Sequence, residues 1–158
     1  MAKRSAGLLI YRRGGGDIQV LLVHPGGPFW AKKDDGAWSI PKGLVDDDED
    51  ELAAARRETS EEIGITMDGP FTRLGDYKQP GGKTVIAWSV EADIEIDAAA
   101  IKSNTFTMEW PPRSGSMKEF PEVDRAGWFS LAEAEVKILQ GQRPMLSDLV
   151  ERLDRTTK

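Results

Sequence analysis

Cysteine and long apolar runs are both missing from these 158 residues. Without cysteine, neither a disulfide bridge nor thiolate chemistry can contribute to folding or catalysis. No apolar stretch approaches the roughly 20 residues of a membrane-spanning helix, so we expect no membrane partner. The N-terminal MAKRSAGLLIYRR superficially resembles a signal peptide, but Arg12 and Arg13 interrupt its apolar run and no small-residue cleavage site follows. We therefore interpret this run as a first strand and expect a cytoplasmic protein.

Positive charge is also in short supply. The chain has 21 Lys and Arg residues against 27 Asp and Glu residues, which gives a formal net charge of −6. Proteins that bind nucleic acids generally present a basic face, so this composition argues against a nucleic-acid partner. A small phosphate-containing ligand remains compatible with the negative charge, because acidic side chains can bind phosphates through metal ions.

The remaining composition is typical of a soluble globular protein, with 39% hydrophobic and 30% charged residues. The length suits a domain of common size, so we predict a single domain over residues 1–158. Hydrophobic periodicity and turn residues predict strands at 6–12, 18–23, 71–77, 83–94, 105–110 and 124–130, a short extended piece at 37–40, and closing helices at 131–139 and 145–153. The predicted fold class is α/β (α+β), a mixed sheet flanked by helices.

The segment Gly43–Ile65, GLVDDDEDELAAARRETSEEIGI, has the most unusual pattern in the chain. The acidic run at 46–48 supplies candidates for a helix N-cap, and Gly64 stands where a helix would close with a left-handed residue. A weakly apolar stripe at spacings of three and four predicts a helix through the second half of this segment; its members are Leu52, Ala55, Thr59 and Ile63.

Beside this stripe, three carboxylates crowd onto one patch of the expected helix. Glu58, Glu61 and Glu62 stand at positions i, i+3 and i+4. Like charges at these spacings destabilise a helix by roughly a few tenths of a kcal/mol per pair. The cluster makes most physical sense if a positive group lies between the carboxylates, and a hard divalent cation is the leading candidate.

Two less specific interpretations compete for the same segment. The first is an acidic helix face that is simply solvated. The second is a calcium loop, suggested by Asp46, Asp48 and Asp50, but such a loop requires glycine at its sixth position and glutamate at its twelfth. Those positions hold Glu51 and Arg57, so the calcium loop is excluded.

The full spacing distinguishes these possibilities. Gly43, Glu49 and the run 57–65, RETSEEIGI, fill every charged and glycine position of a pattern that resembles the signature of the Nudix hydrolases, which cleave diphosphates linked to a nucleoside or another group. The one departure is Thr59, where an aliphatic residue is more usual. The preceding residues 38–43, WSIPKG, resemble the same region of family members that act on dinucleoside polyphosphates, although related enzymes with other substrates share it.

The resemblance implies a Nudix-like α/β/α sandwich and a role for each acidic residue. Glu58 and Glu62 would ligate Mg²⁺ or Mn²⁺, with Glu61 either a ligand or acting through water. Glu49 and Arg57 would form an ion pair that holds the loop and the helix in register. The metal would neutralise the diphosphate and polarise the attacking water.

Further metal ligands are expected outside the helix. The carbonyl of Lys42 is one candidate, and its ammonium group is also a candidate phosphate contact. Family members usually add a carboxylate from just before a strand that ends in tryptophan, which points first to Glu122 and second to Glu119. Both also fit ordinary loop acids. The general base is either a helix glutamate or this external carboxylate.

Substrate contacts are predicted less specifically. Trp30 and Trp110 fit either a base-stacking role or the core, and Arg113 fits either a phosphate contact or a solvated charge. His24 is the single histidine, and phosphate contact, acid–base work and a structural role all remain open. The segment 103–121, rich in proline and aromatic residues, is interpreted as a substrate-facing loop.

The leading hypothesis is a magnesium-dependent pyrophosphohydrolase that cleaves a nucleoside or dinucleoside polyphosphate by water attack on phosphorus. One alternative keeps the chemistry but changes the substrate to ADP-ribose, an oxidised nucleotide or a non-nucleotide diphosphate. Another is a nucleotide-binding module without catalysis. The expected partner is a small molecule, and a homodimer is compatible with the sequence.

Overall fold

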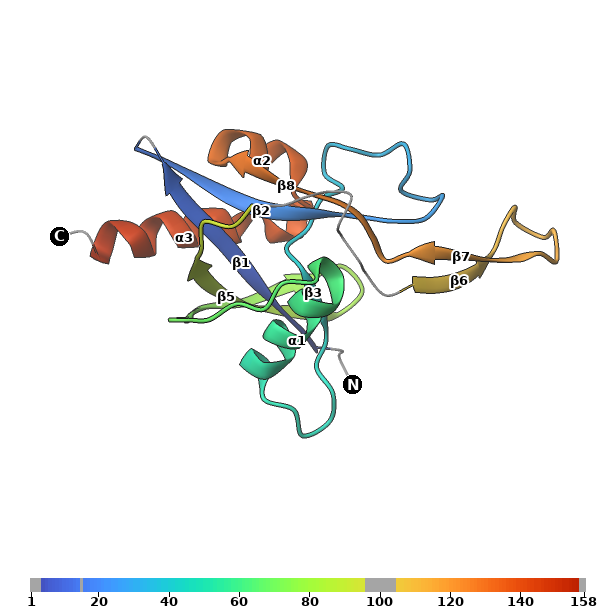
Figure 1. Ribbon diagram of the computed structural model, residues 1–158, viewed down its shortest axis with the longest axis horizontal. Helices are drawn as coiled ribbons and strands as arrows, with labels where there is room; N and C mark the ends of the chain where they lie inside the picture. Colours follow the sequence, from blue (N-terminus) through green and yellow to red (C-terminus); the bar gives the residue numbers. More distant parts are fainter. Residues whose placement is uncertain (1–3, 15, 96–104, 157–158) are drawn as a thin grey trace.

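A computed structural model describes residues 4–14, 16–95 and 105–156, without the side chains of the last two. At its centre is a six-stranded mixed sheet in the order β4-β5-β1-β2-β8, with β3 paired to β1 (Figure 1). Only the β1–β5 pair is parallel. The sheet strands are β1 (Arg4–Gly14), β2 (Asp17–Pro25), β3 (Lys42–Leu44), β4 (Thr72–Gln79), β5 (Lys83–Glu91) and β8 (Val123–Ser130).

Helices cover both faces of this sheet. One apolar cluster packs between the sheet and α1 (Glu51–Ile63), and a second packs against α2 (Leu131–Lys137), η2 (Gln140–Gln142) and α3 (Arg143–Thr156). Along β1, Leu8 and Ile10 belong to the first cluster whereas Leu9 and Tyr11 belong to the second, because successive side chains of a strand point to opposite faces. The predicted mixed sheet flanked by helices is confirmed.

The segment leading into α1 is held inside the sheet. β1 and β2 pair with each other only at residues 11–14 and 17–20. Beyond that point the chain enters between them: Ser39 exchanges two backbone hydrogen bonds with Val23, at 2.8 and 3.0 Å, and the N–H of Leu8 donates to the carbonyl of Pro41 at 3.2 Å. Residues 42–44 then form β3, which the sequence did not predict.

Both ends of α1 have specific caps. The N-cap is Asp50, whose carboxylate accepts from the N–H of Ala53 at 3.1 Å, so the prediction of an N-cap within the run 46–48 was wrong. At the other end Gly64 has φ of 73° and its N–H donates to the carbonyl of Ser60, as predicted. These caps fix where the helix begins and ends.

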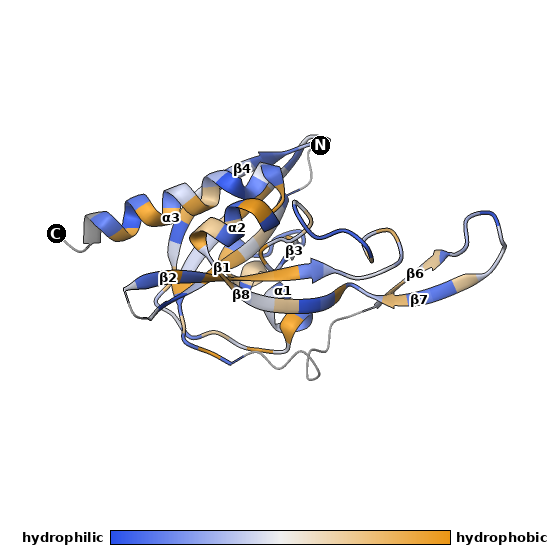
Figure 2. Ribbon diagram, turned by 90° about the horizontal axis from the view of Figure 1, so that it is seen from above, coloured by the Kyte–Doolittle hydropathy of each residue, from blue (hydrophilic) through white to orange (hydrophobic). Residues whose placement is uncertain are grey.

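A two-stranded ribbon extends from the body of the molecule (Figures 1 and 2). It consists of β6 (Thr105–Glu109) and β7 (Met117–Pro121). The strand predicted at 105–110 is therefore present, and residues 110–116 form a loop as predicted. The prediction of a loop was wrong for residues 117–121, which form β7; positions 103 and 104 lie outside the described residues.

The remaining elements follow the predicted pattern with shifted ends. The first closing helix stops at Lys137, and the second runs from Arg143 to Thr156. Among the described residues, no helix combines the length and apolar character needed to cross a membrane.

Candidate functional site

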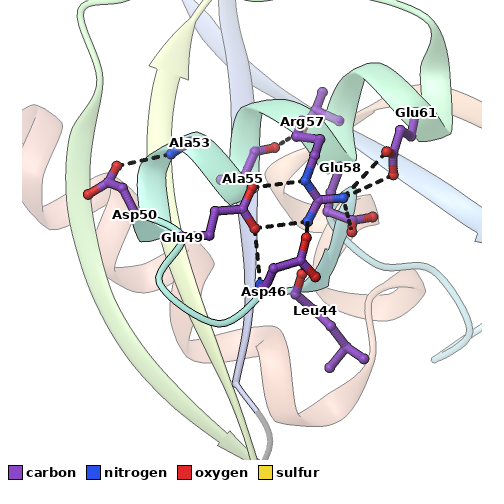
Figure 3. Close-up of polar contacts among 10 residues, drawn as sticks. Leu44, Asp46, Glu49, Asp50, Ala53, Ala55, Arg57, Glu58 and Glu61 are labelled. Atoms are coloured by element: carbon purple, nitrogen blue, oxygen red, sulfur yellow. Dashed lines mark hydrogen bonds and ion pairs between the residues drawn. The ribbon is translucent and has the colours of Figure 1, made fainter.

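Arg57 lies at the centre of a network that ties α1 to the preceding loop (Figure 3). Its Nε and Nη2 atoms donate to the two carboxylate oxygens of Glu49 at 2.9 and 3.0 Å, and Nη2 also donates to the carbonyl of Leu44 at 3.0 Å. Its Nη1 atom donates to Glu58 at 2.9 Å and to Glu61 at 3.3 Å. The hydrogen bonds from Arg57 lower the pKa of Glu49.

Glu62 is the most deeply buried carboxylate of the helix, with 9% of its surface exposed. It accepts a hydrogen bond from the backbone N–H of Lys42 at 3.2 Å. Burial raises the pKa of Glu62 to about 8, and the negative charges of Glu58 and Glu122 add to this effect, whereas Lys42 opposes it. Such a carboxyl gives up its proton readily only when a positive group approaches.

Glu58 lies directly against the backbone of Gly43. A Cβ atom at position 43 would stand 2.0 Å from the carboxyl carbon of Glu58, so a side chain there is incompatible with this arrangement. Burial raises the pKa of Glu58, although Arg57 opposes the shift, and the charges of Glu61 and Glu122 reinforce it. Glycine is therefore required at position 43 for close approach.

A cavity of about 230 Å³ opens beside these carboxylates. Its lining includes four polar residues, namely Ser39, Lys42, Glu62 and Glu122. The apolar part of the wall comprises Val23, Pro25, Trp30, Ala37, Ile40, Val123 and Leu139. A cavity lined by both carboxylates and apolar side chains suits a ligand that joins a metal-bound phosphate to a flat organic group.

The two candidates for the external carboxylate occupy different places. Glu122 immediately precedes β8, lines the cavity, and is close enough to Glu58 and Glu62 for its charge to raise the pKa of both. Glu119 lies on β7 opposite Thr107, where it is exposed and does not line the cavity. The geometry therefore favours Glu122 over Glu119.

The predicted substrate residues are likewise separated. Trp30 and Lys42 both line the cavity. Trp110 and Arg113 belong to the connection between β6 and β7, at the far end of the ribbon, and neither lines the cavity. The cavity thus brings together only Trp30 and Lys42 of these four residues.

Some residues of the site had no local signal in the sequence. Leu139 reaches the cavity from the segment after α2, where its N–H donates to the carbonyl of Trp38 at 2.8 Å. Gln142 is fully buried and its side-chain amide bridges Ser39 and the backbone N–H of Ile40, at 2.9 and 3.1 Å. Only contacts between distant segments reveal these two residues.

The donor set can be tested for its fit to a divalent cation. Within residues 4–14, 16–95 and 105–156, no three acidic or histidine side chains are grouped closely enough to count as a formed metal site, and Arg57 engages Glu58 and Glu61 directly. The chemistry nevertheless fits, because Glu58, Glu62 and Glu122 offer carboxylate oxygens and the first two have raised pKa values.

The family model for the NUDIX domain matches residues 1–149. This chain belongs to the Nudix family. The match covers every element that forms the cavity, and it agrees with the signature predicted at Gly43–Ile65.

Two relatives with the same name are similar in sequence to this chain. A bis(5'-nucleosyl)-tetraphosphatase [asymmetrical] from Caenorhabditis elegans is 44% identical over 68 residues, which cover 43% of this chain and 45% of that protein. The Rattus norvegicus protein of the same name is 35% identical over 113 residues, covering 61% of this chain and 71% of that protein. The chain thus spans under half the length of the nematode relative.

Two solved structures have the same fold. A binary complex of the C. elegans Ap4A hydrolase has a TM-score of 0.63 at 26% identity and covers 97% of this chain and 98% of that one. The NUDIX domain of Shewanella oneidensis NrtR, in complex with ADP ribose, has a TM-score of 0.66 at 15% identity and covers 97% and 89%. At that identity the NrtR similarity concerns the fold alone.

Proposed function

We propose that this protein is a metal-dependent Nudix hydrolase that cleaves a dinucleoside polyphosphate by water attack on phosphorus. The observation that carries the proposal is the presence of Glu62 and Glu122 in the lining of one cavity together with Trp30 and several apolar side chains. The relatives named as bis(5'-nucleosyl)-tetraphosphatases support this substrate class.

Glu58, Glu62 and Glu122 would hold the cation, which we propose to be Mg²⁺, and the carbonyl of Lys42 is a further candidate ligand. A bound cation of this type neutralises phosphate charge and lowers the pKa of a coordinated water. Hard oxygen donors in this arrangement suit Mg²⁺ or Mn²⁺.

The protein's own residues have distinct proposed tasks. Arg57 holds Glu49 and the loop above it against the helix, so that the carboxylates keep a fixed direction. The backbone N–H of Lys42 fixes the orientation of Glu62. Lys42 lines the cavity, and we propose that its ammonium group contacts phosphate oxygens. Positioning and charge stabilisation of this kind supply most of the rate enhancement in phosphoryl transfer.

The apolar side chains that line the cavity would receive one nucleoside. Trp30 offers a flat surface on which a base could stack, and Ile40 and Leu139 complete an apolar slot. We propose that Trp110 and Arg113, at the far end of the ribbon, do not contact this nucleoside. We further propose that residues 1–158 act as one domain in the cytoplasm.

The test is turnover of a panel with Mg²⁺ present. The panel contains diadenosine tetraphosphate, ADP-ribose, an oxidised nucleoside triphosphate and a non-nucleotide diphosphate. We expect diadenosine tetraphosphate to be cleaved fastest, with asymmetric cleavage giving a nucleoside triphosphate and a nucleoside monophosphate. A different best substrate would keep the chemistry and replace the substrate class.

The matched variants are Glu62→Gln, which removes a proposed ligand, and Glu119→Gln, which removes an exposed acid on the ribbon. We expect Glu62→Gln to abolish turnover while Glu119→Gln retains it. Saturable nucleotide binding without turnover of any compound would instead identify a binding module.

A further inference from the structure

His24 is a fully buried polar residue whose two ring nitrogens both face an acceptor. Its Nδ1 atom lies 2.8 Å from a carboxylate oxygen of Asp124, and its Nε2 atom lies 2.6 Å from the backbone carbonyl of Lys33. A neutral imidazole donates from one nitrogen only, and its tautomer decides which of the two contacts receives that hydrogen. The ring thus joins two segments that are far apart in sequence.

The contact between His24 and Asp124 lies two residues from Glu122 in the chain. In the β2–β8 ladder His24 pairs with Arg125 and Pro25 pairs with Val123, so Asp124 is an extra residue without a partner on β2. A bulge of this kind bends a strand and redirects neighbouring side chains, and bulges are common beside active sites. His24 contacts the side chain of the extra residue, Asp124. The two residues that precede Asp124, Glu122 and Val123, both line the cavity.

The contact with Lys33 lies beside another part of the cavity lining. The carbonyl of Lys33 ends a turn in which the Lys33 N–H donates to the carbonyl of Trp30 at 2.9 Å. Trp30 lines the cavity, and Pro25, next to His24, lines it as well. The imidazole ring also meets the ring of Trp38 edge-on, with 5.2 Å between centroids. The imidazole ring of His24 therefore contacts the turn at residues 30–33, which carries Trp30.

We propose that His24 is a positioning residue that sets Trp30 and Glu122, two residues of the cavity lining, relative to each other. Through Nδ1 it fixes the start of β8 and hence Glu122; through Nε2 it fixes the turn at 30–33 and hence Trp30. This inference rests on the proposed function for the roles of Trp30 and Glu122 in substrate binding and catalysis. The two contacts of His24 do not depend on any substrate.

Two substitutions separate the two contacts. The amide nitrogen of asparagine is as many bonds from Cα as Nδ1, and that of glutamine is as many as Nε2. His24→Asn can therefore keep the donor to Asp124 and lose the donor to Lys33, whereas His24→Gln does the reverse. His24→Leu removes both and serves as the reference for a general loss of packing.

Steady-state kinetics on the best substrate of the panel should divide these variants. We expect His24→Gln to lower kcat on the order of tenfold to a hundredfold with little change in KM, because Glu122 is displaced. We expect His24→Asn to raise KM by about threefold to tenfold with little change in kcat, because Trp30 is no longer held. A merely structural role would change both variants in parallel, in proportion to their loss of thermal stability, and that result would overturn the proposal.

Hydrogen exchange measured by mass spectrometry gives a readout that needs no activity. Faster exchange should be confined to residues 122–126 in His24→Gln and to residues 26–34 in His24→Asn. If the wild-type protein cleaves no member of the panel, the proposed function fails, yet this exchange pattern still supports or overturns the link through His24. Equal exchange in both segments for both variants overturns it.

Discussion

The carboxylate of Glu58 lies where a Cβ atom of residue 43 would have to be. The space between the two is closed by the β3 pairing, which presses residues 42–44 against β1, and by α1, which packs on the same strand. Glu58 can therefore occupy this position only because Gly43 has no side chain. In this position the carboxylate of Glu58 accepts a hydrogen bond from Arg57.

Replacing Gly43 by alanine should therefore displace a proposed ligand without unfolding the protein. We expect Gly43→Ala to lower kcat/KM on the order of a hundredfold, because a shift of about 1 Å at a reacting group has that effect. The end of the Glu58 side chain can move aside, so thermal unfolding should change little. Gly14→Ala is the matched control, since a Cβ there meets nothing within 4 Å. Equal activity of both variants would contradict the argument.

The raised pKa of Glu62 predicts a pH-dependent stability in metal-free protein. From the usual value of 4.5 up to about 8, the unfolded carboxyl has lost its proton while the folded one retains it. The contribution of Glu62 to the free energy of unfolding should therefore be greatest below this window and should fall as the pH rises through it. At about 1.4 kcal/mol per pKa unit, the loss by pH 8 is at most about 5 kcal/mol.

Glu62→Gln should remove this dependence. Denaturant unfolding in chelator at pH 5 and pH 8 measures it, and the stability of the variant relative to wild type should rise between the two. The Gln side chain can still accept from the N–H of Lys42, so the comparison isolates the charge. A difference that does not change with pH would rule out the perturbed carboxyl.

Metal binding should release a proton in the same pH range. A cation at Glu62 requires the ionised carboxylate, so below pH 8 the apparent affinity for Mg²⁺ should rise by up to about tenfold per pH unit. Calorimetric titration at pH 7 in two buffers of different ionisation enthalpy should show close to one proton released. Release of no proton would argue against Glu62 as a ligand.

Arg57 should not be replaceable by lysine. Lysine keeps the charge but loses the planar fork that donates to both oxygens of Glu49 and to the carbonyl of Leu44. About a third of the side chain is exposed, so we expect Arg57→Lys to cost only about 1–2 kcal/mol of unfolding free energy, with a larger relative loss of kcat. In a double-mutant cycle with Glu49→Gln the two effects should be non-additive; strict additivity would mean that the pair does not act as a unit.

The two candidate tryptophans should behave differently. Trp30 lines the cavity, so Trp30→Ala should raise KM by about threefold to tenfold through loss of a stacking surface. Trp110→Ala should leave KM within about twofold, since that residue lies on the ribbon. The measurement is KM for the best substrate, and a larger effect at Trp110 would show that the ribbon reaches the substrate.

The helix α1 within the segment Gly43–Ile65 could be predicted because its determinants are local. Its apolar stripe, the closing Gly64 and the spacing of Glu58, Glu61 and Glu62 all lie within a few turns of one another. The pairing of Glu49 with Arg57 spans only eight positions, so the signature pattern was sufficient to predict it. The N-cap was misplaced because Asp46, Asp48 and Asp50 are chemically equivalent as caps, and the backbone path alone selects Asp50.

The cavity depends instead on segments that meet only in the folded chain. Glu122 and Glu119 are three positions apart, yet the boundary between the β6–β7 ribbon and β8 sends one to the cavity and the other to the exposed ribbon. His24 and Asp124 are 100 positions apart, and their contact requires the bulge in the β2–β8 ladder. The sequence by itself predicted the proposed reaction class, because carboxylates suited to binding a metal can be encoded on one helix. The tertiary structure alone decided which residues form the walls of the cavity, because strand pairing and burial act between distant positions.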